Sequence, residues 1–558
     1  MDRKTIIAFL FIAVLLLLYP LYMQWLGLGK KSTTPVTTGQ DTSTVPQPAN
    51  LEEAAPSPIA KEKMARSPGF VPSAQGPEKE IAVETPLYKA VFSSKGGSLK
   101  SFVLKKYVDY NKGEIELIKN GPEEYNLDIV FPDSSFALSA LNFTPDKSDL
   151  RLAGKGQKGE VTFKYFGSGL AVTRSYILYS DKYTIELGLS VESKTDFLGR
   201  KYFLTWNSGL PTTEKNLGED LSYFATYAYL GGELLENKGP KNDSLQESSR
   251  SGKTVWVASR SKYFVASLIS PDSSASGFST TGRNFYILQN GQKVLAGKRL
   301  TVSLEKEVPN QLSFTHHFLI HIGPMDYWAL RKYGLDLENM VNLGWVLFKP
   351  FAIGILWFFV NFYKIIPNYG VVIIIFTLLM KIIFFPLSRK MTKTSLMMAE
   401  MAPKISKLKE KYKDDKQKLN QEIFKLYKEH GINPLGGCLP LLIQIPIFWA
   451  FFVLLRTTIE MRQAPFLGWI TDLSLKDPYY ILPILMTVAM FFQQRMTIKD
   501  PRQKMMVYLM PGLFFFMFMG FPAGLTLYWT IYNILSVFEQ YMIRSQMQPI
   551  AEQEPHNN

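Results

Sequence analysis

The C-terminal third of this chain carries long apolar stretches with almost no charge. Residues 431–455, 478–494 and 505–538 lack charged side chains, and residues 350–388 contain only two lysines. About 20 apolar residues are enough for a helix to cross the hydrocarbon core of a bilayer. The stretches therefore predict a multi-pass α-helical membrane protein.

Two of the stretches are too long for one helix and contain natural breaks. Gly520-Phe-Pro-Ala-Gly524 divides 505–538, and Pro367-Asn368 divides 350–388. The part before Pro367 is rich in Trp and Phe, which is typical of an amphipathic helix in the membrane interface; a re-entrant or spanning helix is the alternative. With the N-terminal stretch we predict six transmembrane helices, 6–26, 369–388, 435–455, 479–495, 506–520 and 523–540, of which the last five form the core.

The N-terminal stretch is uncharged from residue 5 to residue 29 and follows Arg3-Lys4. A signal peptide has an apolar core of about 7–15 residues and a cleavage site between small residues. This stretch is longer and has no A-x-A pattern. We therefore expect residues 1–29 to remain as a membrane anchor, with a cleaved signal peptide as the alternative.

The charges of the loops predict the orientation, because cytoplasmic loops carry an excess of Lys and Arg. Loop 389–430 has 12 basic and 6 acidic residues, loop 495–504 has 4 and 1, and loop 457–478 has 2 and 3. We expect the first two loops and both termini to be cytoplasmic. Of the net charge of +14, residues 345–558 hold 23 basic minus 13 acidic, or +10, so the charge indicates topology rather than a specific nucleic-acid partner.

The region between anchor and core divides into a polar and a β-rich part. Residues 30–80 are rich in Pro, Ser and Thr and contain one aromatic side chain, which predicts a disordered tether. Residues 81–325 show short alternating runs, such as 183–191, and an Asn290-Gly291 pair typical of a hairpin turn. We expect a large exported all-β sandwich domain without a disulfide, since the domain contains no cysteine.

Catalytic and metal-binding signals are weak. His317 and His321 share a face of one predicted strand with His316 nearby, but their spacing of about 13 Å is too long for one metal ion. The sequence has no P-loop, nucleophile elbow or H-E-x-x-H motif. We expect no metal, no cofactor and no catalytic residue. A carbohydrate-active β domain stays open, because one sequence cannot place a pair of carboxylates.

Residues 389–433 predict a helical hairpin. Apolar residues recur at 4-3-4 spacing on both sides of Asp414-Asp415, which is typical of two amphipathic helices packed together. The basic surface suggests docking of the ribosome, RNA or anionic lipids; positive-inside bias alone is the alternative. The apolar residues are Met401, Ile405, Leu408, Tyr412, Leu419, Ile423 and Leu426.

Lys381 lies inside the predicted span 369–388. A charge there costs about 2.5–3.5 kcal/mol on insertion scales, so it must face protein or water; snorkelling to the interface is the alternative. Thr377 is one turn away, and Gln444 lies in the span 435–455. We expect these groups to converge in a hydrated pocket. With no acidic residue expected in a span to pair with Lys381, the pocket would be positive and attract acidic segments.

Several long motifs resemble a known family. Residues 432–449 (INPLGGCLPLLIQIPIFW), 459–486 and 521–529 (FPAGLTLYW) are similar to the YidC membrane-protein insertases, kin of the mitochondrial Oxa proteins. The β-rich region resembles the large periplasmic domain of the Gram-negative branch. The resemblance implies a bacterial inner-membrane protein that inserts and folds newly made membrane proteins without ATP, alone or with the Sec translocon. It also implies a hydrophilic groove open to cytoplasm and lipid, beside an apolar slide.

The resemblance assigns residues to this groove. Lys381 falls at the position of its basic residue, where many relatives have arginine; lysine attracts acidic segments but lacks the planar fork that grips a carboxylate. Thr377 and Gln444 fall in the polar lining. The implied slide consists of Ile445, Phe448, Phe452, Tyr528 and Trp529.

The leading interpretation is an insertase and chaperone, not an enzyme. We expect a monomer whose partners are nascent membrane proteins, the Sec translocon, the ribosome and anionic lipids. A secondary transporter with its substrate site at Lys381 is the alternative. The predicted parts are the anchor 1–29, the tether 30–80, the sandwich 81–325, the interfacial-helix region 326–366, the core 367–545 with the hairpin 389–433, and a cytoplasmic tail 546–558.

Overall fold

The computed structural model describes residues 76–546, apart from 120–125, 134–135, 168, 195–198, 243, 273–274, 290–291, 309–311, 432–438 and 499–503. The chain divides into two compact units, Met1–Pro324 and Met325–Asn558. The predicted anchor, nearly all of the tether and tail, and Cys438 lie outside the described residues.

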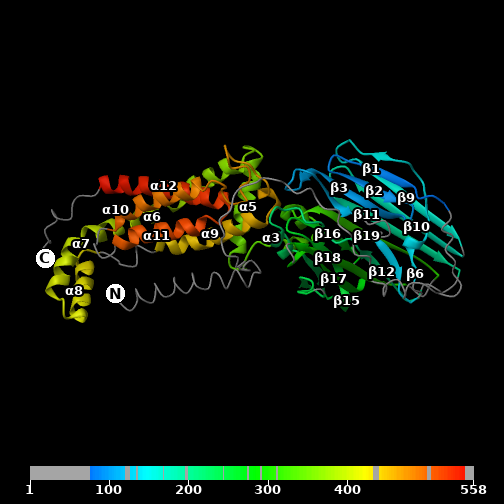
Figure 1. Ribbon diagram of the computed structural model, residues 1–558, viewed down its shortest axis with the longest axis horizontal. Coiled ribbons are helices and arrows are strands. Elements are labelled where there is room, and N and C mark those ends of the chain that lie inside the picture. Colours follow the sequence, from blue (N-terminus) through cyan, green and yellow to red (C-terminus); the bar gives the residue numbers. More distant parts are fainter. Residues whose placement is uncertain are drawn as a thin grey trace. The chain divides into compact units, whose positions relative to one another are not determined.

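The described residues of the first unit form two β-sheets (Figure 1). One has five strands in the order β4-β3-β2-β1-β8. The other has fourteen, with the main path β6-β5-β12-β18-β17-β15-β16-β19-β11-β10-β9-β7; off this path, β13 pairs with β15 and β14 pairs with β13. The strands are β1 (Glu80–Glu84), β2 (Tyr88–Ser93), β3 (Ser98–Val108), β4 (Glu114–Lys119), β5 (Asp128–Phe131), β6 (Phe136–Ala137), β7 (Thr144–Pro145), β8 (Leu150–Arg151), β9 (Lys158–Gly167), β10 (Leu170–Tyr179), β11 (Thr184–Ser193), β12 (Lys201–Trp206), β13 (Ala225–Leu230), β14 (Glu233–Asn237), β15 (Gln246–Arg260), β16 (Phe264–Ile269), β17 (Ala275–Gln289), β18 (Gln292–Glu307) and β19 (Ser313–Pro324), with short helices η1 (Leu138–Ala140) and α3 (Leu217–Ser222).

The predicted alternation accounts for these strands, because successive side chains of a strand point to opposite faces. On β11 the four apolar residues of the alternating run, Ile185, Leu187, Leu189 and Val191, are all buried. β17 and β18 form the predicted hairpin, which closes with Gln289 opposite Gln292. The expected turn residues, Asn290-Gly291, lie outside the described residues.

The two sheets are joined by a common core. Phe92 of β2 lies 4.6 Å from Tyr176 of β10, measured between ring centroids. Arg174 of β10 is fully buried and donates hydrogen bonds to the carbonyls of Gly96, at 2.6 Å, and Leu127, at 2.7 Å. A buried guanidinium needs such acceptors, because an unpaired buried charge is strongly unfavourable. The prediction of sandwich-like all-β sheets is confirmed.

The histidines of β19 take part in this packing. His316 Nδ1 lies 2.7 Å from the hydroxyl of Tyr202 on β12. His321 is buried, with 3% of its surface exposed. Within the described part of the chain, no group of three or more His, Cys, Asp or Glu side chains is arranged to hold a metal ion.

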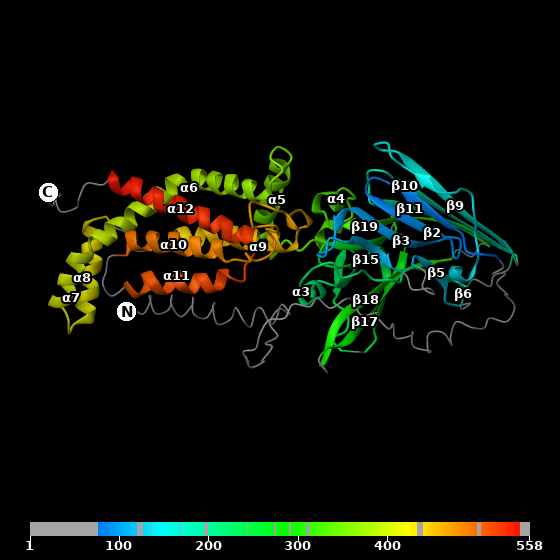
Figure 2. The same cartoon turned by 45° about the horizontal axis from the view of Figure 1, so that its top comes forward.

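The second unit is helical (Figure 2). In both views α6, α10, α11 and α12 run side by side, and α7 and α8 form a pair beyond one end of them. The elements are α4 (Tyr327–Arg331), η2 (Leu337–Met340), α5 (Lys349–Tyr363), α6 (Tyr369–Glu400), α7 (Ala402–Lys411), α8 (Lys416–Glu429), α9 (Leu439–Thr457), η4 (Ile459–Met461), α10 (Ile481–Thr497), α11 (Lys504–Phe518) and α12 (Ala523–Ser545).

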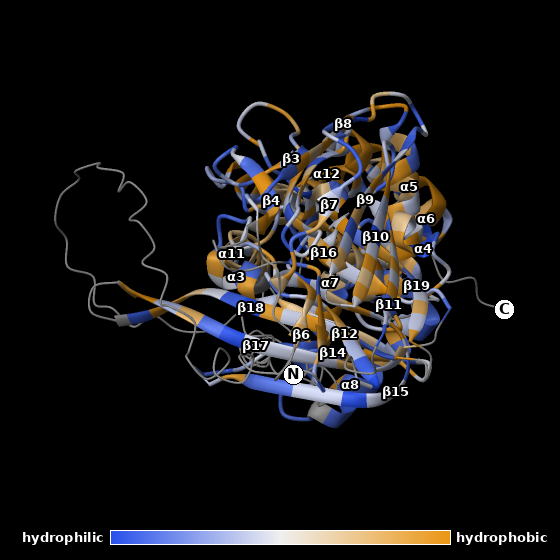
Figure 3. Cartoon of the chain, turned by 90° about the vertical axis from the view of Figure 1, so that its right-hand side faces the viewer, coloured by the Kyte–Doolittle hydropathy of each residue, from blue (hydrophilic) through white to orange (hydrophobic). Residues whose placement is uncertain are grey.

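Hydropathy separates the two units. In Figure 3, α5 and α6 are mostly orange, whereas β15 and β17 change between blue, white and orange. Among the described helices, α6 alone meets both the length and the composition needed to cross a membrane. Four more segments are apolar but shorter: Lys349–Tyr363, Gln444–Thr457, Ile481–Met496 and Val507–Phe518. The helical core is therefore present, while the count of six transmembrane helices stays a prediction.

Helix α6 is longer than predicted. It starts at the expected break, where the Asn368 side chain accepts a hydrogen bond from Val371 N at 3.1 Å. It then continues through Pro386 to Glu400, whereas we expected the span to end at residue 388. Lys, Met, Leu and Ala in 389–400 favour a helix, so a basic loop after a span can extend that helix.

Helix α5 is not amphipathic in itself. Its inward face buries Ala352, Leu356 and Phe359. Its outward face carries Phe351 and Trp357, which are 47% and 56% exposed. Both faces are apolar, so the helix lacks the polar face that we expected, while its place in the membrane interface stays a prediction.

The predicted hairpin is present in α7 and α8. Asp415 caps α8 by accepting a hydrogen bond from Lys418 N at 2.9 Å. The apolar residues of the two helices face each other, and the methionines that precede α7 join them. The cluster consists of buried Met401 and Ile405, with Met397, Met398, Ile423, Leu426 and Tyr427 packed against it.

Candidate substrate-binding cavity

A cavity of about 300 Å³ opens between helices of the second unit. Its walls come from α6, α10 and α12, with one residue of α9. Most of the lining residues carry polar side chains, although the outer surfaces of these helices are apolar. The lining residues are Lys381, Ser388, Met391, Thr392 and Ser395 of α6, Gln444 of α9, Met490, Gln493 and Gln494 of α10, and Trp529, Tyr532, Asn533, Ser536, Glu539 and Gln540 of α12.

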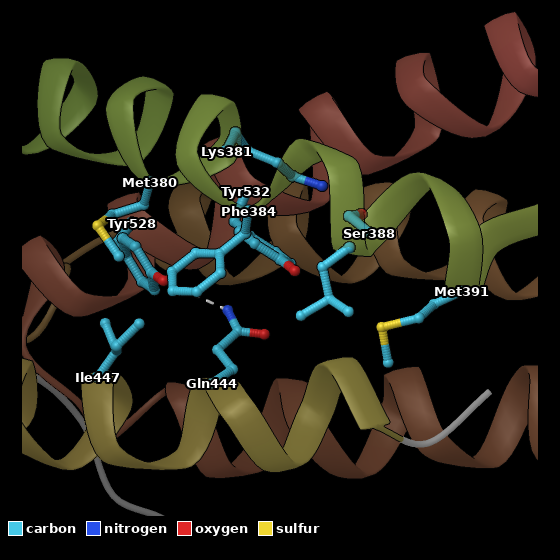
Figure 4. Close-up of a pocket in the computed structure, with 10 residues that line it drawn as sticks. Met380, Lys381, Phe384, Ser388, Met391, Gln444, Ile447, Tyr528 and Tyr532 are labelled. Carbon is cyan, nitrogen blue, oxygen red and sulfur yellow. Dashed lines mark hydrogen bonds between the residues drawn. The ribbon is translucent and has the colours of Figure 1, made fainter. Parts of the chain in front are cut away.

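A smaller pocket of about 40 Å³ adjoins this cavity (Figure 4). The two share five lining residues, namely Lys381, Ser388, Met391, Gln444 and Tyr532. The rest of the smaller pocket is mainly apolar, with Met380, Phe384, Leu387, Ile447 and Tyr528. A polar space and an apolar space therefore meet at Lys381.

Lys381 is paired, contrary to our expectation. Its Nζ atom lies 2.8 Å from Oε2 of Glu539 and 4.4 Å from the ring centroid of Tyr532. The Ser388 hydroxyl donates to the other oxygen of Glu539 at 2.6 Å. Glu539 stands at the end of the predicted span 523–540, directly after the charge-free stretch, and we overlooked it as a partner. The site is an ion pair rather than an isolated positive charge.

Three wall residues offer polar atoms that are free to bind. Trp529 Nε1, Asn533 Nδ2 and Gln540 Oε1 are buried and have no hydrogen-bond partner within the described residues. A buried polar atom without a partner costs about 1–3 kcal/mol. The two nitrogens are donors and the oxygen is an acceptor, so the cavity can hydrogen-bond a hydrophilic chain or water.

Of the two residues predicted beside Lys381 in the polar lining, Gln444 lines the cavity and Thr377 does not. Gln444 lines both spaces and donates to the Tyr528 hydroxyl at 3.4 Å, the dashed line in Figure 4. Thr377 is fully buried and donates to the carbonyl of Ile373 in its own helix at 2.7 Å. It is not among the residues that line either space. The Thr377 hydroxyl is therefore hydrogen-bonded within α6 and does not face the cavity.

The predicted slide residues form a largely closed aromatic cluster. Phe448 of α9 lies 6.0 Å from Trp529 of α12 and 6.5 Å from Phe452, measured between ring centroids. Tyr528 is 1% exposed and stacks on Phe451 at 5.1 Å. Ile445 is 38% exposed and turns outward. Of the described slide residues, Ile445 therefore offers the most surface to a passing helix.

Sequence reasoning missed most of the α12 wall. Asn533, Ser536 and Gln540 recur at helical spacing on one face of an otherwise apolar segment. We treated the segment as a plain span and singled out only its aromatic start. The polar stripe was a readable signal, because polar side chains inside a membrane helix face the protein interior or a water-filled cavity.

Comparison with known proteins identifies the family. The profile described as "YidC periplasmic domain" matches residues 80–357, and the profile "60Kd inner membrane protein" matches residues 361–552. The "Membrane protein insertase YidC" of Syntrophus aciditrophicus is 35% identical over 98% of this chain and 100% of its own length. The chain belongs to the YidC family of membrane protein insertases.

A second relative agrees with this assignment. The protein of the same name from Chlorobium luteolum is 33% identical over 98% of this chain and 95% of its own length. A solved structure described as "Active YidC insertase crystal structure with the first transmembrane domain resolved" aligns with 87% of this chain and 96% of its own, at 20% identity and a TM-score of 0.37. Family membership favours an insertase and does not support the transporter alternative.

Proposed function

We propose that this protein inserts and folds newly made inner-membrane proteins by lodging their hydrophilic segments in the cavity of α6, α10 and α12. The observation that carries the proposal is the polar cavity inside helices whose outer surfaces are apolar. Exposed Ile382 of α6, Val488 of α10 and Phe538 of α12 form part of that outer surface. The contrast suits a site that is surrounded by lipid and wet inside.

Such a cavity lowers the barrier to crossing the bilayer. A charged side chain at the membrane centre costs about 2.5–3.5 kcal/mol on insertion scales. Asn533, Gln540 and Ser388 can replace part of the hydration that the segment loses. No bond is made or broken, so the chemistry is that of a binding surface and not of an enzyme.

We place the cavity on the cytoplasmic side of six transmembrane helices, with both termini in the cytoplasm and the β domain in the periplasm. The lining of α6 lies toward the end that leads to the hairpin, whose residues 389–430 carry 12 basic and 6 acidic side chains. Helix α5 would lie in the membrane interface. Helix α10 has 17 residues and reaches about 25 Å, less than the hydrocarbon thickness of about 30 Å, which favours local thinning.

The aromatic cluster of α9 and α12 is our candidate for the apolar slide. Ile445 and Phe448 would receive the apolar part of a substrate while the cavity holds its polar part. We further propose that the protein works as a monomer, alone or with the Sec translocon. The basic hairpin is the candidate contact for ribosomes and anionic lipids.

The first test fills the cavity with apolar side chains. In cells depleted of the native insertase, the variant with leucine at Asn533, Ser536 and Gln540 should lose insertion of a two-span substrate with a hydrophilic exported loop. A matched control places three leucines on the outward face of the same helix, at Ile534, Phe538 and Tyr541, and should retain insertion. Normal insertion by the cavity variant, at equal protein level, would refute the proposal.

The second test measures access of water. Cysteines replace Lys381, Gln444 or Thr377 in a chain whose own Cys438 is changed to serine. We expect a membrane-impermeant thiol reagent to label positions 381 and 444 but not position 377, because Thr377 is buried in α6. Protection of all three positions would contradict a hydrated cavity.

A further inference from the structure

The charge balance of the cavity depends on one residue. Of the described lining residues, Lys381 and Glu539 are the charged ones, and they form a contact of 2.8 Å. Their side chains are 12% and 6% exposed. The wall is therefore bipolar and has no net charge, so long-range attraction of acidic segments by Lys381 is largely cancelled.

Both ends of this pair can exchange partners. A carboxylate of a substrate can replace Glu539 at Lys381, and an ammonium or guanidinium group can replace Lys381 at Glu539. The displaced member stays beside polar groups that can receive it. Ser388 already donates to Glu539, and the ring of Tyr532 lies under Lys381. Each exchange conserves the number of ion pairs, and the polar groups of the wall lower the cost of the displaced charge.

We propose that Glu539 is a specificity-determining residue that lets the cavity accept hydrophilic segments carrying either an acidic or a basic residue. This inference rests on the proposed function of the cavity. Without Glu539 the site would present an isolated positive charge, and it would favour acidic segments and reject basic ones. Specificity is a difference of affinities, and a like charge in the site acts against the wrong partner.

The test compares two substrates that differ by one residue, Asp or Lys, at the centre of the exported loop, and follows their insertion by protease protection. The readout is the ratio of the two insertion rates in each variant relative to wild type. The membrane potential acts equally on a given substrate in every variant, so it cancels in this comparison. Glu539→Gln should shift the ratio toward the Asp substrate by about tenfold, and Lys381→Gln should shift it toward the Lys substrate by a similar factor.

The exchanged pair provides the decisive control. The double variant with Lys381→Glu and Glu539→Lys restores one charge of each sign, so its ratio should return to within about threefold of wild type. Ser388→Ala keeps both charges and should leave the ratio unchanged. The inference is overturned if Glu539→Gln leaves the ratio as it was, or if the exchanged pair does not restore it.

A third substrate separates this inference from the proposed function. It carries Asn at the same position and has no charge to sort. Its insertion can depend on the polar α12 wall while Glu539→Gln leaves the ratio of the Asp and Lys insertion rates unchanged. In that case only the inference about Glu539 fails. If its insertion is indifferent to leucines at Asn533, Ser536 and Gln540, then the cavity itself is not the insertion site.

Discussion

The two units each bury a Lys–Glu ion pair, and the two pairs differ in their surroundings. In the β unit Lys262 Nζ lies 3.0 Å from Oε1 of Glu219, with side-chain exposures of 7% and 17%. In the helical unit Lys381 lies 2.8 Å from Glu539, with exposures of 12% and 6%. By length and burial the two contacts are nearly the same.

Around Lys262 the neighbours are aromatic. The rings of Tyr263 and Tyr223 lie 5.0 and 5.7 Å from its Nζ. Around Lys381 the wall of a cavity of about 300 Å³ supplies hydroxyl and amide groups. The comparison teaches that an ion pair packed against aromatic rings is structural, whereas an ion pair on the polar wall of a cavity can exchange partners.

Removing the lysine should give the largest difference in stability between the two ion pairs. We expect Lys262→Met to lower the free energy of unfolding of the β unit by about 3 kcal/mol, because it removes the counter-ion of the partly buried Glu219. Lys381→Met should cost about 1 kcal/mol or less, since the cavity can solvate Glu539. Thermal unfolding of the full chain in detergent measures both, with exposed Lys106→Met as the control. Equal losses would break the comparison.

Protonation of the buried His321 should destabilise the β unit. Burial lowers the pKa of His321 to about 4, against a usual value of 6.5, and a hydrogen bond to the backbone of Pro324 offsets part of this. The unfolded chain binds this proton below pH 6.5 and the folded unit only near pH 4. The histidine thus destabilises the fold as the pH falls from 6.5 to 4, by roughly 3 kcal/mol.

This pH effect is measured as a difference between two proteins. His321→Gln should narrow the gap in unfolding free energy between pH 7 and pH 4.5 relative to wild type. Burial raises the pKa of Asp220 to about 6, which has the opposite dependence and is present in both proteins. An unchanged gap would show that water reaches β19.

Arginine should be tolerated at one pair and not at the other. Lys262→Arg forces a larger planar group between packed rings, and overpacking of this kind costs about 1–3 kcal/mol. Lys381→Arg has the cavity to extend into, so insertion should stay within about twofold of wild type. The two measurements are the thermal unfolding of the β unit and the insertion rate. A loss of insertion with Lys381→Arg would mean that the wall is tightly packed.

The smallest effect should come from Ser388→Ala. It removes one hydrogen bond to Glu539 and leaves the ion pair in place. A hydrogen bond to a charged group contributes about 1.5–3 kcal/mol in a closed interior, and less beside water. We expect less than a threefold change in insertion of an uncharged substrate. A larger change would give Ser388 a direct role toward the substrate.

Most of the fold could be predicted from local patterns in the sequence. Alternation placed β11, charge-free stretches placed α9 to α12, and 4-3-4 spacing placed α7 and α8, because each signal lies within a few residues along the chain. The order of strands in the sheets and the continuation of α6 past residue 388 depend on contacts and helix propensity beyond those windows.

The site was harder to predict than the fold. Lys381 and Gln444 stood out as polar residues in apolar surroundings, and both line the cavity. Glu539 is 158 residues away from Lys381, and no local pattern links them. Thr377 looked equally suited to the pocket, but a threonine inside a helix can satisfy its hydroxyl with the carbonyl four residues earlier, as it does here.

The carboxylate of Glu539 grips α6 at two points on either side of Pro386. One oxygen meets Lys381 before the proline and the other meets Ser388 after it. Proline has no N–H to bond the preceding turn, so the 32-residue helix lacks one backbone hydrogen bond here. The carboxylate thus connects the parts of α6 that lie before and after this turn. A charge on the substrate that draws Glu539 or Lys381 away weakens this connection. The part of α6 that leads into the hairpin is then free to tilt.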